Sequence, residues 1–272
     1  MWAEYLAVVS EVDKLIGEHA SYSHFQGCLF DLSLLLLLVC CLWLISMLVD
    51  KPWVANAIWP VWPVVLGSSI LYRSPMREVS PKQMLLLSVI GFWSVRLGLH
   101  LTAARGNWQY VQLKELFGAR QFKLASLMVL FLGKAALVTV ACLPMYAALR
   151  NRFSQVSELD LVGLLVMLVG VLIETYADEL VSQTDNKVLV DVGPWLYCRH
   201  PNYFGEWLFW VGLWIFSGLD RVGTAGPILV LLVLFAVSAP LMEEHHLEVR
   251  REEYELYVQR VPSSFFPLPF HW

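Results

Sequence analysis

The residues best suited to chemistry form one dense run, from Gly193 to Glu206, between two apolar segments. The run reads Gly-Pro-Trp-Leu-Tyr-Cys-Arg-His-Pro-Asn-Tyr-Phe-Gly-Glu. Its second proline follows His200, disfavours helix at that histidine and suits the first turn of a helix, so we expect a new helix to begin at Pro201 or the next residue. The free N–H groups at this helix start, next to Arg199, would suit a phosphate.

In the helix expected here, Asn202 and Glu206 lie one turn apart and would face the same cavity. Tyr203 or Trp207 can stack on a ring, and the Glu206 carboxylate can accept a hydrogen bond from an amide or a hydroxyl. The plainer alternative is a loop with interfacial aromatic residues and ordinary helix capping. So dense a cluster favours a binding site for a ligand that carries both an anionic group and a ring.

Two pairs of ionisable residues lie in apolar segments, and the two members of each pair are four positions apart. A charged side chain at the centre of a membrane helix costs roughly 2.5–3.5 kcal/mol. Arg96 and His100 share one helix face, and Arg105 follows just beyond the segment. Glu174 and Asp178 also share a face, where two carboxylates suit ribose hydroxyls, amides or a cation. The alternatives are snorkelling or a helix contact for the first pair, and a helix leaving the membrane for the second.

Other polar residues in apolar surroundings give weaker signals. Lys134 stands alone in its segment, which favours snorkelling or a contact between helices. His245 and His246 are adjacent and point in different directions on a helix, and the sequence has neither an HExxH motif nor a CxxC pair. We therefore expect no metal site, and no disulfide framework from the 5 cysteines.

Composition restricts the fold that must hold these residues. The 272 residues are 58% hydrophobic and 15% charged, whereas a soluble domain is about a quarter charged. The apolar residues also come in long blocks, which indicates an integral protein of the lipid bilayer. The net charge of −4 offers no basic face to a nucleic acid.

A bilayer core needs roughly 20 apolar residues per helix. The candidate spans are Leu29–Val49, Trp53–Tyr72, Met84–Ala103, Leu124–Leu149, Leu159–Ala177, Trp207–Ser217 and Thr224–Leu241. The sixth is short, so the sequence predicts an all-α polytopic transmembrane helical bundle of about six to seven spans. We expect a polar N-terminal segment at 1–28 and a single membrane domain at 29–272, with the cofactor-binding part at about 159–272. The charged stretch that begins near Glu243 is expected to form an amphipathic helix at the interface.

Several patterns together carry a family resemblance. They are the run 193–206, Glu-Glu at 243–244, Glu-Tyr-x-x-Tyr at 253–257 and Phe-Pro-Leu-Pro at 266–269. These patterns resemble membrane proteins with a steroid 5α-reductase-type C-terminal domain, and most of all the DUF1295 subgroup, which is labelled only as a domain of unknown function. Upstream, a Val-Asp-Lys-x-Trp turn, an Arg-Leu-x-x-His motif and a Glu-Thr-x-Ala-Asp motif extend the resemblance over most of residues 48–269.

The resemblance implies a fold and an activity. The wider superfamily includes steroid and polyprenol reductases, sterol ring reductases, very-long-chain enoyl reductases and isoprenylcysteine carboxyl methyltransferases. Its members use a helical bundle whose cytosolic half holds a nucleotide cofactor while a lipid enters from the membrane. The implied activity is NADPH-dependent reduction of a C=C bond, of the enone or enoyl type, in a lipid such as a sterol, steroid, polyprenal or fatty acyl chain.

The resemblance also implies which residues hold the cofactor. By position they are Arg105, Glu174, Asp178, Lys187, Arg199, His200, Asn202, Tyr203 and Glu206. The steroid enzymes carry an arginine about seven residues after the position of Asp178, where this chain has Asp185. Lys187 is the nearby residue expected to compensate.

The catalytic step needs a proton donor beside the double bond. His100 is our candidate for it, with Asp50 as a partner and Arg96 on the same helix face. One hydrogen bond to a developing enolate would be strong in the low dielectric inside a helical bundle.

Two alternatives stay open from the sequence. The methyltransferase relatives share an Arg-His-Pro segment and the Glu-Glu and Tyr-x-x-Tyr tail, so the first is a membrane methyltransferase that uses S-adenosylmethionine. The second is a non-catalytic lipid-binding membrane protein, which the presence of Asp185 favours. The expected membrane is the endoplasmic reticulum in a eukaryote and the inner membrane in a bacterium. Ten basic loop residues against seven favour a cytosolic C-terminus.

Overall fold

In the computed structural model, helices are the regular secondary structure of the described part of the chain, and that part contains no strand. The described residues are 2–73, 79–103, 108–150, 155–184 and 188–268. The side chains of some of them are not described, namely those of residues 2–25, 102–103, 108–109, 112–113 and 119–120. The predicted all-α class is confirmed.

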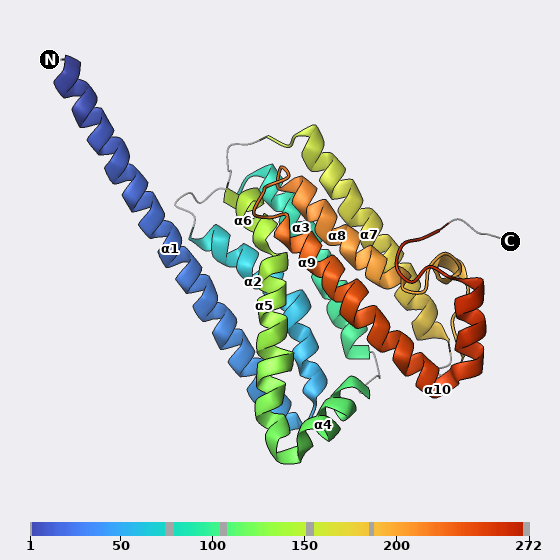
Figure 1. Cartoon of the computed structure of the whole chain (residues 1–272). Helices are drawn as coiled ribbons and strands as arrows, with labels where there is room; N and C mark the ends of the chain where they lie inside the picture. Colours follow the sequence, from blue (N-terminus) through green and yellow to red (C-terminus); the bar gives the residue numbers. More distant parts are fainter. Residues whose placement is uncertain (1, 74–78, 104–107, 151–154, 185–187, 269–272) are drawn as a thin grey trace.

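Helices of very different length make up the bundle (Figure 1). They are α1 (Trp2–Val49), α2 (Ile58–Tyr72), α3 (Pro81–Ala103), α4 (Trp108–Ala125), α5 (Gly133–Ala141), α6 (Leu143–Arg150), α7 (Glu158–Gln183), α8 (Pro201–Phe216), α9 (Ala225–Val233) and α10 (Ala239–Arg260). Short helical segments join some of them: η1 (Pro52–Ala57), η2 (Ser126–Leu132), η3 (Gly193–Leu196) and η4 (Leu234–Ser238).

Within the described residues, 6 helical segments are long and apolar enough to cross a membrane. They are Gln26–Val49, Pro52–Tyr72, Pro81–Leu101, Gln121–Ala141, Glu158–Gln183 and Ala225–Arg260. The predicted multi-pass bundle is therefore confirmed. The short sixth span of the prediction corresponds to α8, whose 16 residues give a length of about 24 Å.

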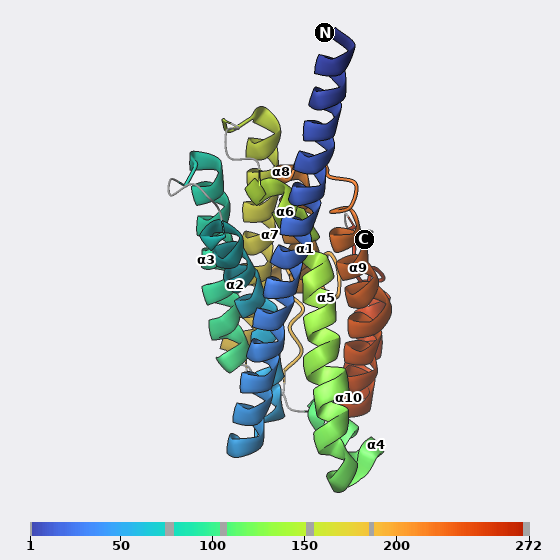
Figure 2. The same ribbon diagram turned by 90° about the vertical axis from the view of Figure 1, so that its left-hand side faces the viewer.

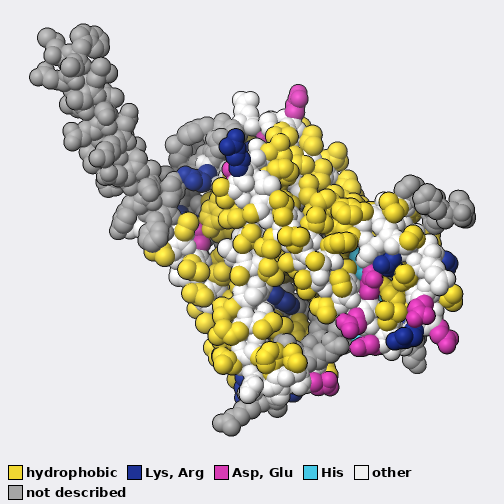
Figure 3. Space-filling view, viewed as in Figure 1, with side chains coloured by type: hydrophobic (Ala, Val, Ile, Leu, Met, Phe, Trp, Pro, Cys, Tyr) yellow, Lys and Arg dark blue, Asp and Glu magenta, His cyan; other side chains and the backbone are white. Residues whose placement is uncertain are grey.

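Apolar side chains cover the outside of the bundle, as a lipid environment requires. Leu37 and Leu165 are both more than half exposed although they lie within the membrane-crossing parts of α1 and α7. Figure 3 shows hydrophobic side chains over the bundle, whereas acidic and basic side chains gather over the far end of α10. There the helix kinks at Arg250, which has φ −150° and ψ 54°. The part beyond the kink belongs to the charged stretch that we expect at the interface, and that placement stays a prediction.

Glycines bring α7 and α8 into unusually close contact. A Cβ atom on Gly170 would lie 2.5 Å from the Gly205 carbonyl oxygen, and one on Gly212 would lie 2.5 Å from the Met167 nitrogen. Gly163 makes an equally close approach to Phe216. Backbones can come so near only where no side chain intervenes, as at small-residue interfaces of membrane helices. This seam fixes α8 against α7 along its length.

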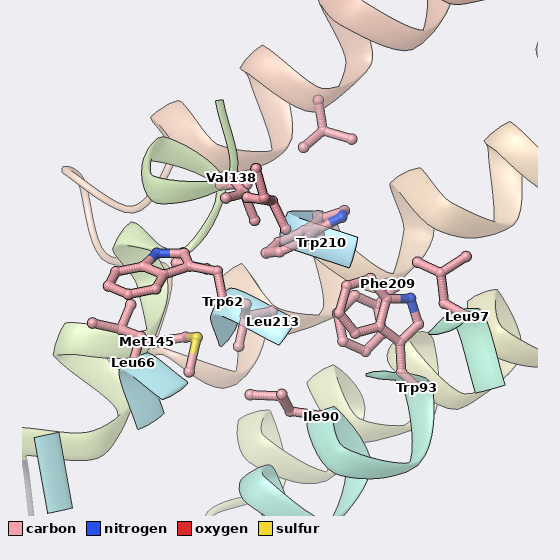
Figure 4. Close-up of a cluster of buried hydrophobic side chains, with 14 of the residues drawn as sticks. Trp62, Leu66, Ile90, Trp93, Leu97, Val138, Met145, Phe209, Trp210 and Leu213 are labelled. Carbon is pink, nitrogen blue, oxygen red and sulfur yellow. The ribbon is translucent and has the colours of Figure 1, made fainter. Parts of the chain in front are cut away.

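A tryptophan-rich core fills the middle of the bundle (Figure 4). Trp62, Trp93 and Trp210 are at most 1% exposed. The Trp93 ring stacks on Phe209 with 4.5 Å between centroids, and Trp210 meets Trp93 edge to face at 5.6 Å. These contacts lock α3 onto α8, so the polar side chains farther along both helices are held on a rigid frame.

Candidate functional site

A cavity of about 300 Å³ lies where α3 and α7 end and α8 begins, and the polar part of α10 forms another wall. Its charged and polar lining includes His100, Asp178, Arg199, His200, Asn202 and Arg250. Its aromatic lining is Trp195, Tyr203, Tyr254 and Tyr257. Pockets for small ligands combine an apolar or aromatic wall with a few placed polar groups, and this cavity has that character.

The predicted helix start is confirmed. Helix α8 begins at Pro201, and His200 before it has φ −135° and ψ 61°, outside the helical region. Gly193 takes the left-handed φ of 61°, and a Cβ atom there would lie 2.9 Å from Leu180. This turn lets η3 bring Trp195 against α7, where the Trp195 indole N–H donates to the Ala177 carbonyl at 3.2 Å.

Asp178 is the residue on which three helices converge. Its carboxylate accepts a hydrogen bond from Arg96 of α3, lies 3.6 Å from His100 Nε2 and accepts from Asn202 Nδ2 of α8 at 3.2 Å. Arg96 also lies 2.7 Å from Glu174, one turn earlier on α7. The two predicted pairs, Arg96 with His100 and Glu174 with Asp178, therefore face each other across α3 and α7.

We call this group, formed by Arg96, His100, Glu174, Asp178 and Asn202, the Asp178 junction. Two of its oxygens, Glu174 Oε2 and Asn202 Oδ1, have no hydrogen-bond partner among the described residues. Both are shielded from solvent, and buried polar atoms are nearly always paired, so each such atom calls for an explanation. Asn202 lines the cavity, so a ligand with an N–H or O–H group can supply its missing partner.

Arg199 has a different set of contacts from the one we expected. Its guanidinium binds the Glu243 carboxylate with Nε and Nη2, each at 3.1 Å, and the carbonyls of Val261 and Pro262 with Nη1 at 2.9 and 2.7 Å. These contacts occupy most of its donors, although the side chain lies at the cavity wall. The structure therefore gives Arg199 a positioning role toward the C-terminal segment.

Glu243 organises the same corner, and its role was not evident from its spacing alone. It also contacts His200 Nε2 at 3.1 Å and accepts from Ser264 Oγ at 2.6 Å. Two backbone hydrogen bonds complete the attachment, from the Arg199 N–H to the Ser263 carbonyl and from the Leu268 N–H to the Tyr197 carbonyl. Residues 261–268, which we call the C-terminal strap, are thereby fixed beside the start of α8.

His200 and Tyr203 lie at the cavity as predicted, with their rings stacked at a centroid distance of 5.1 Å. Cys198, between them and η3, is fully buried. Burial raises the pKa of its thiol to about 11, so it is a neutral thiol and not a nucleophile at physiological pH.

The prediction that Glu206 shares a cavity with Asn202 is wrong. Glu206 is 6% exposed, and its carboxylate accepts the indole N–H groups of Trp59 at 2.6 Å, Trp93 at 3.0 Å and Trp210 at 2.8 Å. Three indole donors from three helices draw the carboxylate into the tryptophan core, which helix spacing alone does not reveal. Glu206 thus ties α2, α3 and α8 together.

The expected pairing of His100 with Asp50 is also wrong. Asp50 lies exposed in the turn after α1, with a left-handed φ of 51°, and the acid beside His100 is Asp178. Arg105 and Lys187 lie outside the described residues. No group of three or more metal-ligating residues occurs in the described part of the chain.

Comparison with known proteins identifies the family. The model for "Protein of unknown function (DUF1295)" matches residues 42–261, which is most of the chain and includes every helix of the cavity. The chain is a DUF1295 protein. Neither the curated proteins nor the solved structures contain a match to it. In this DUF1295 protein the Asp178 junction, the cavity and the C-terminal strap all fall within or next to the matched region.

Proposed function

We propose that this DUF1295 protein is a membrane-bound oxidoreductase that reduces a C=C bond of a lipid with NADPH. The observation that carries the proposal is the Asp178 junction at the edge of an aromatic-lined cavity. It offers a carboxylate and a free amide oxygen on one wall and the rings of Tyr254 and Tyr257 on another.

The residues of the cavity fit part of a dinucleotide. About 300 Å³ is at the lower end of ligand pockets and suits one nucleoside half of the cofactor. Asp178 would accept ribose hydroxyls, and the unpaired Asn202 Oδ1 would accept from a carboxamide or a hydroxyl. The aromatic rings would cover a base. NADPH, when bound, supplies the hydride.

His100 is the proton donor in this proposal. Its Nε2 lies 3.6 Å from the Asp178 carboxylate, which would orient the ring so that it can give a proton to the reduced substrate. Arg96, one turn before His100 on α3, contacts the same Asp178 oxygen and helps to hold the carboxylate in place. A reconstituted assay of His100→Phe tests this assignment: the proposal expects a loss of about 100-fold or more in turnover, and unchanged turnover would exclude the role.

A methyltransferase is the second candidate. Arg199, the cation that we expected to bind a phosphate, is held by Glu243. At the Asp178 junction two carboxylates, those of Glu174 and Asp178, share the single guanidinium of Arg96. An excess of carboxylates suits the sulfonium of S-adenosylmethionine better than a phosphate. The two candidates are separated by the thermal midpoint of the detergent-purified protein with NADPH, NADH and S-adenosylmethionine in parallel, because a ligand specific to the folded state raises it. A rise with S-adenosylmethionine alone would overturn the reductase proposal.

A further inference from the structure

One face of α10 forms a wall of the cavity. Its residues are three or four positions apart, as on one side of a helix, and they are Met242, His246, Arg250, Tyr254 and Tyr257. The kink of the helix at Arg250 falls in the middle of this face. The proposed function uses the two tyrosine rings to cover a base, and it leaves the charged and polar groups of this α10 wall without a role.

The α10 wall lies at a polar end of the molecule. Figures 1 and 2 both show the bend of α10 at the same end of the bundle as α4, away from the start of α1. Figure 3 shows acidic and basic side chains over this part of α10. Such side chains face water or head groups, because a charge is costly in the bilayer core. A water-soluble ligand can reach this wall without crossing the bilayer core.

On the other walls, carboxylates already hold the basic side chains. Arg199 and His200 both contact Glu243, and His100 lies 3.6 Å from Asp178. Asp178 is also the one carboxylate among the described residues that line the cavity. A phosphate in the cavity would therefore find little available positive charge at the start of α8.

Arg250 brings positive charge to the α10 wall. It is half-buried and lines the cavity. A guanidinium is planar and presents N–H donors in a fixed fork that matches two oxygens of a phosphate. Inside a cavity such a charged hydrogen bond is stronger than in water, because the local dielectric constant is lower. Arg250 therefore has the chemistry that we expected of Arg199.

Tyr254 adds a buried donor whose acceptor is missing. Its side chain is 2% exposed and lines the cavity, and its hydroxyl has no hydrogen-bond partner among the described residues. The nearby Arg199 has only donors, so it cannot accept the tyrosine O–H. The His246 ring stacks on the Tyr254 ring at a centroid distance of 5.0 Å and holds it in place. Since buried hydroxyls are nearly always paired, this O–H indicates a ligand oxygen at the α10 wall.

We infer that the α10 wall is a phosphate subsite, where Arg250 and the Tyr254 hydroxyl bind the 5′-phosphate of a nucleoside. The inference deepens the proposed function and rests on it for making that nucleoside one half of NADPH. Asp178 and the aromatic rings of the cavity would hold the ribose and the base. Both halves of a dinucleotide carry a 5′-phosphate, so the experiment has one arm for each half.

The test measures dissociation constants of the full-length protein in detergent for two pairs of probes. One pair is reduced nicotinamide mononucleotide and reduced nicotinamide riboside, and the other is 5′-AMP and adenosine. We expect one phosphorylated probe to bind about tenfold or more tightly than its nucleoside, and the responding pair shows which half the cavity holds. Arg250→Met should remove most of this difference and leave nucleoside binding unchanged. Arg250→Lys should retain part of it, because it keeps the charge but loses the fork.

Two further variants make the test specific. Arg251→Met is the matched control, because it removes the same charge from an exposed neighbour that is not among the described residues lining the cavity. It should leave the difference unchanged, which excludes general attraction to the charged end of α10. Tyr254→Phe removes only the hydroxyl and should reduce the difference by about threefold. Nucleoside binding in each variant shows that the cavity is still folded.

Three results would overturn the inference. The first is an equal phosphate-dependent difference in the wild type and Arg250→Met. The second is a loss in Arg251→Met as large as that in Arg250→Met. The third is that neither phosphorylated probe binds more tightly than its nucleoside.

The thermal midpoint with NADPH, measured on the same samples, keeps this inference apart from the proposed function. If NADPH raises the midpoint of the wild type and of Arg250→Met equally, the reductase proposal stands and the phosphate subsite fails. If NADPH has no effect while a nucleoside phosphate binds through Arg250, the reductase proposal fails and the subsite stands for another nucleotide.

Discussion

Arg199 and Glu243 form a two-pronged ion pair, with the guanidinium Nε and Nη2 each 3.1 Å from a carboxylate oxygen. The pair joins the start of α8 to α10 across 44 positions of sequence. Because the same guanidinium binds the carbonyls of Val261 and Pro262, it also fixes the C-terminal strap. Arg199, which the sequence suggested as a phosphate ligand, therefore links the start of α8, α10 and the C-terminal strap beside the cavity.

Glu243→Gln is expected to destabilise the protein by about 3–5 kcal/mol, because it leaves the Arg199 charge buried without its partner. Hydrogen exchange should become faster at the amides of Arg199 and Leu268, which hold the strap through backbone hydrogen bonds. The exposed Glu255→Gln serves as the matched control and should change neither quantity. Unchanged exchange at both amides would contradict the positioning role.

Gly170→Ala should destabilise the α7–α8 seam by about 1–3 kcal/mol or more, because the new Cβ atom would lie 2.5 Å from a backbone oxygen. Gly98→Ala on α3 is the control, since a Cβ atom there meets no atom within 4 Å. That change should be neutral or slightly stabilising, as alanine favours helix over glycine. Thermal midpoints of the two purified variants make the comparison. Similar midpoints would mean that the seam is looser than described.

Glu206→Gln tests the tryptophan cluster. The amide has one accepting oxygen in place of two, so at least one of three indole N–H groups loses its acceptor and the amide N–H groups meet donors. An unsatisfied buried donor costs about 1–3 kcal/mol, and the loss should appear in the free energy of unfolding together with a change of tryptophan fluorescence. Glu179→Gln, at the exposed end of α7, should show neither effect.

The helices could be predicted because their cause is local. Runs of about 20 apolar residues have one stable form in a bilayer, so the predicted spans agree with the structure to within a few residues for the first three. The predicted span Leu124–Leu149 is divided instead into η2, α5 and α6, with a break at Cys142 just before Pro144. Because proline removes a helix hydrogen bond, the presence of Pro144 in the sequence already indicated a break in this span.

The contacts between helices could be predicted only in part. Spacing by four correctly placed Arg96 with His100 and Glu174 with Asp178 on shared faces, because that depends on helix geometry alone. The same rule failed for Glu206, since its partners Trp59 and Trp93 come from helices far away in sequence. The spacing of residues within one helix does not show which side chains of other helices will form hydrogen bonds with it.

The surroundings of Lys134 could not be predicted from the sequence either. The sequence alone predicts that Lys134 snorkels or contacts another helix, because a lone lysine in an apolar segment normally does one of the two. Its actual neighbours, Asn56 and Tyr110, lie 78 and 24 positions away and supply no counter-charge. Only the folded arrangement shows that the ammonium lacks an anion in the described residues.

The central claim is that the Asp178 junction binds NADPH, and a titration of the thermal midpoint with NADPH tests it most directly. At about 100 times the dissociation constant the wild type should gain about 2.7 kcal/mol of stability. Asn202→Ala should lose most of this gain. Asp160→Asn, which breaks the buried pair with Lys82 at the other end of α7, should start from a lower midpoint and keep the gain. An equal gain in all three proteins would contradict the account.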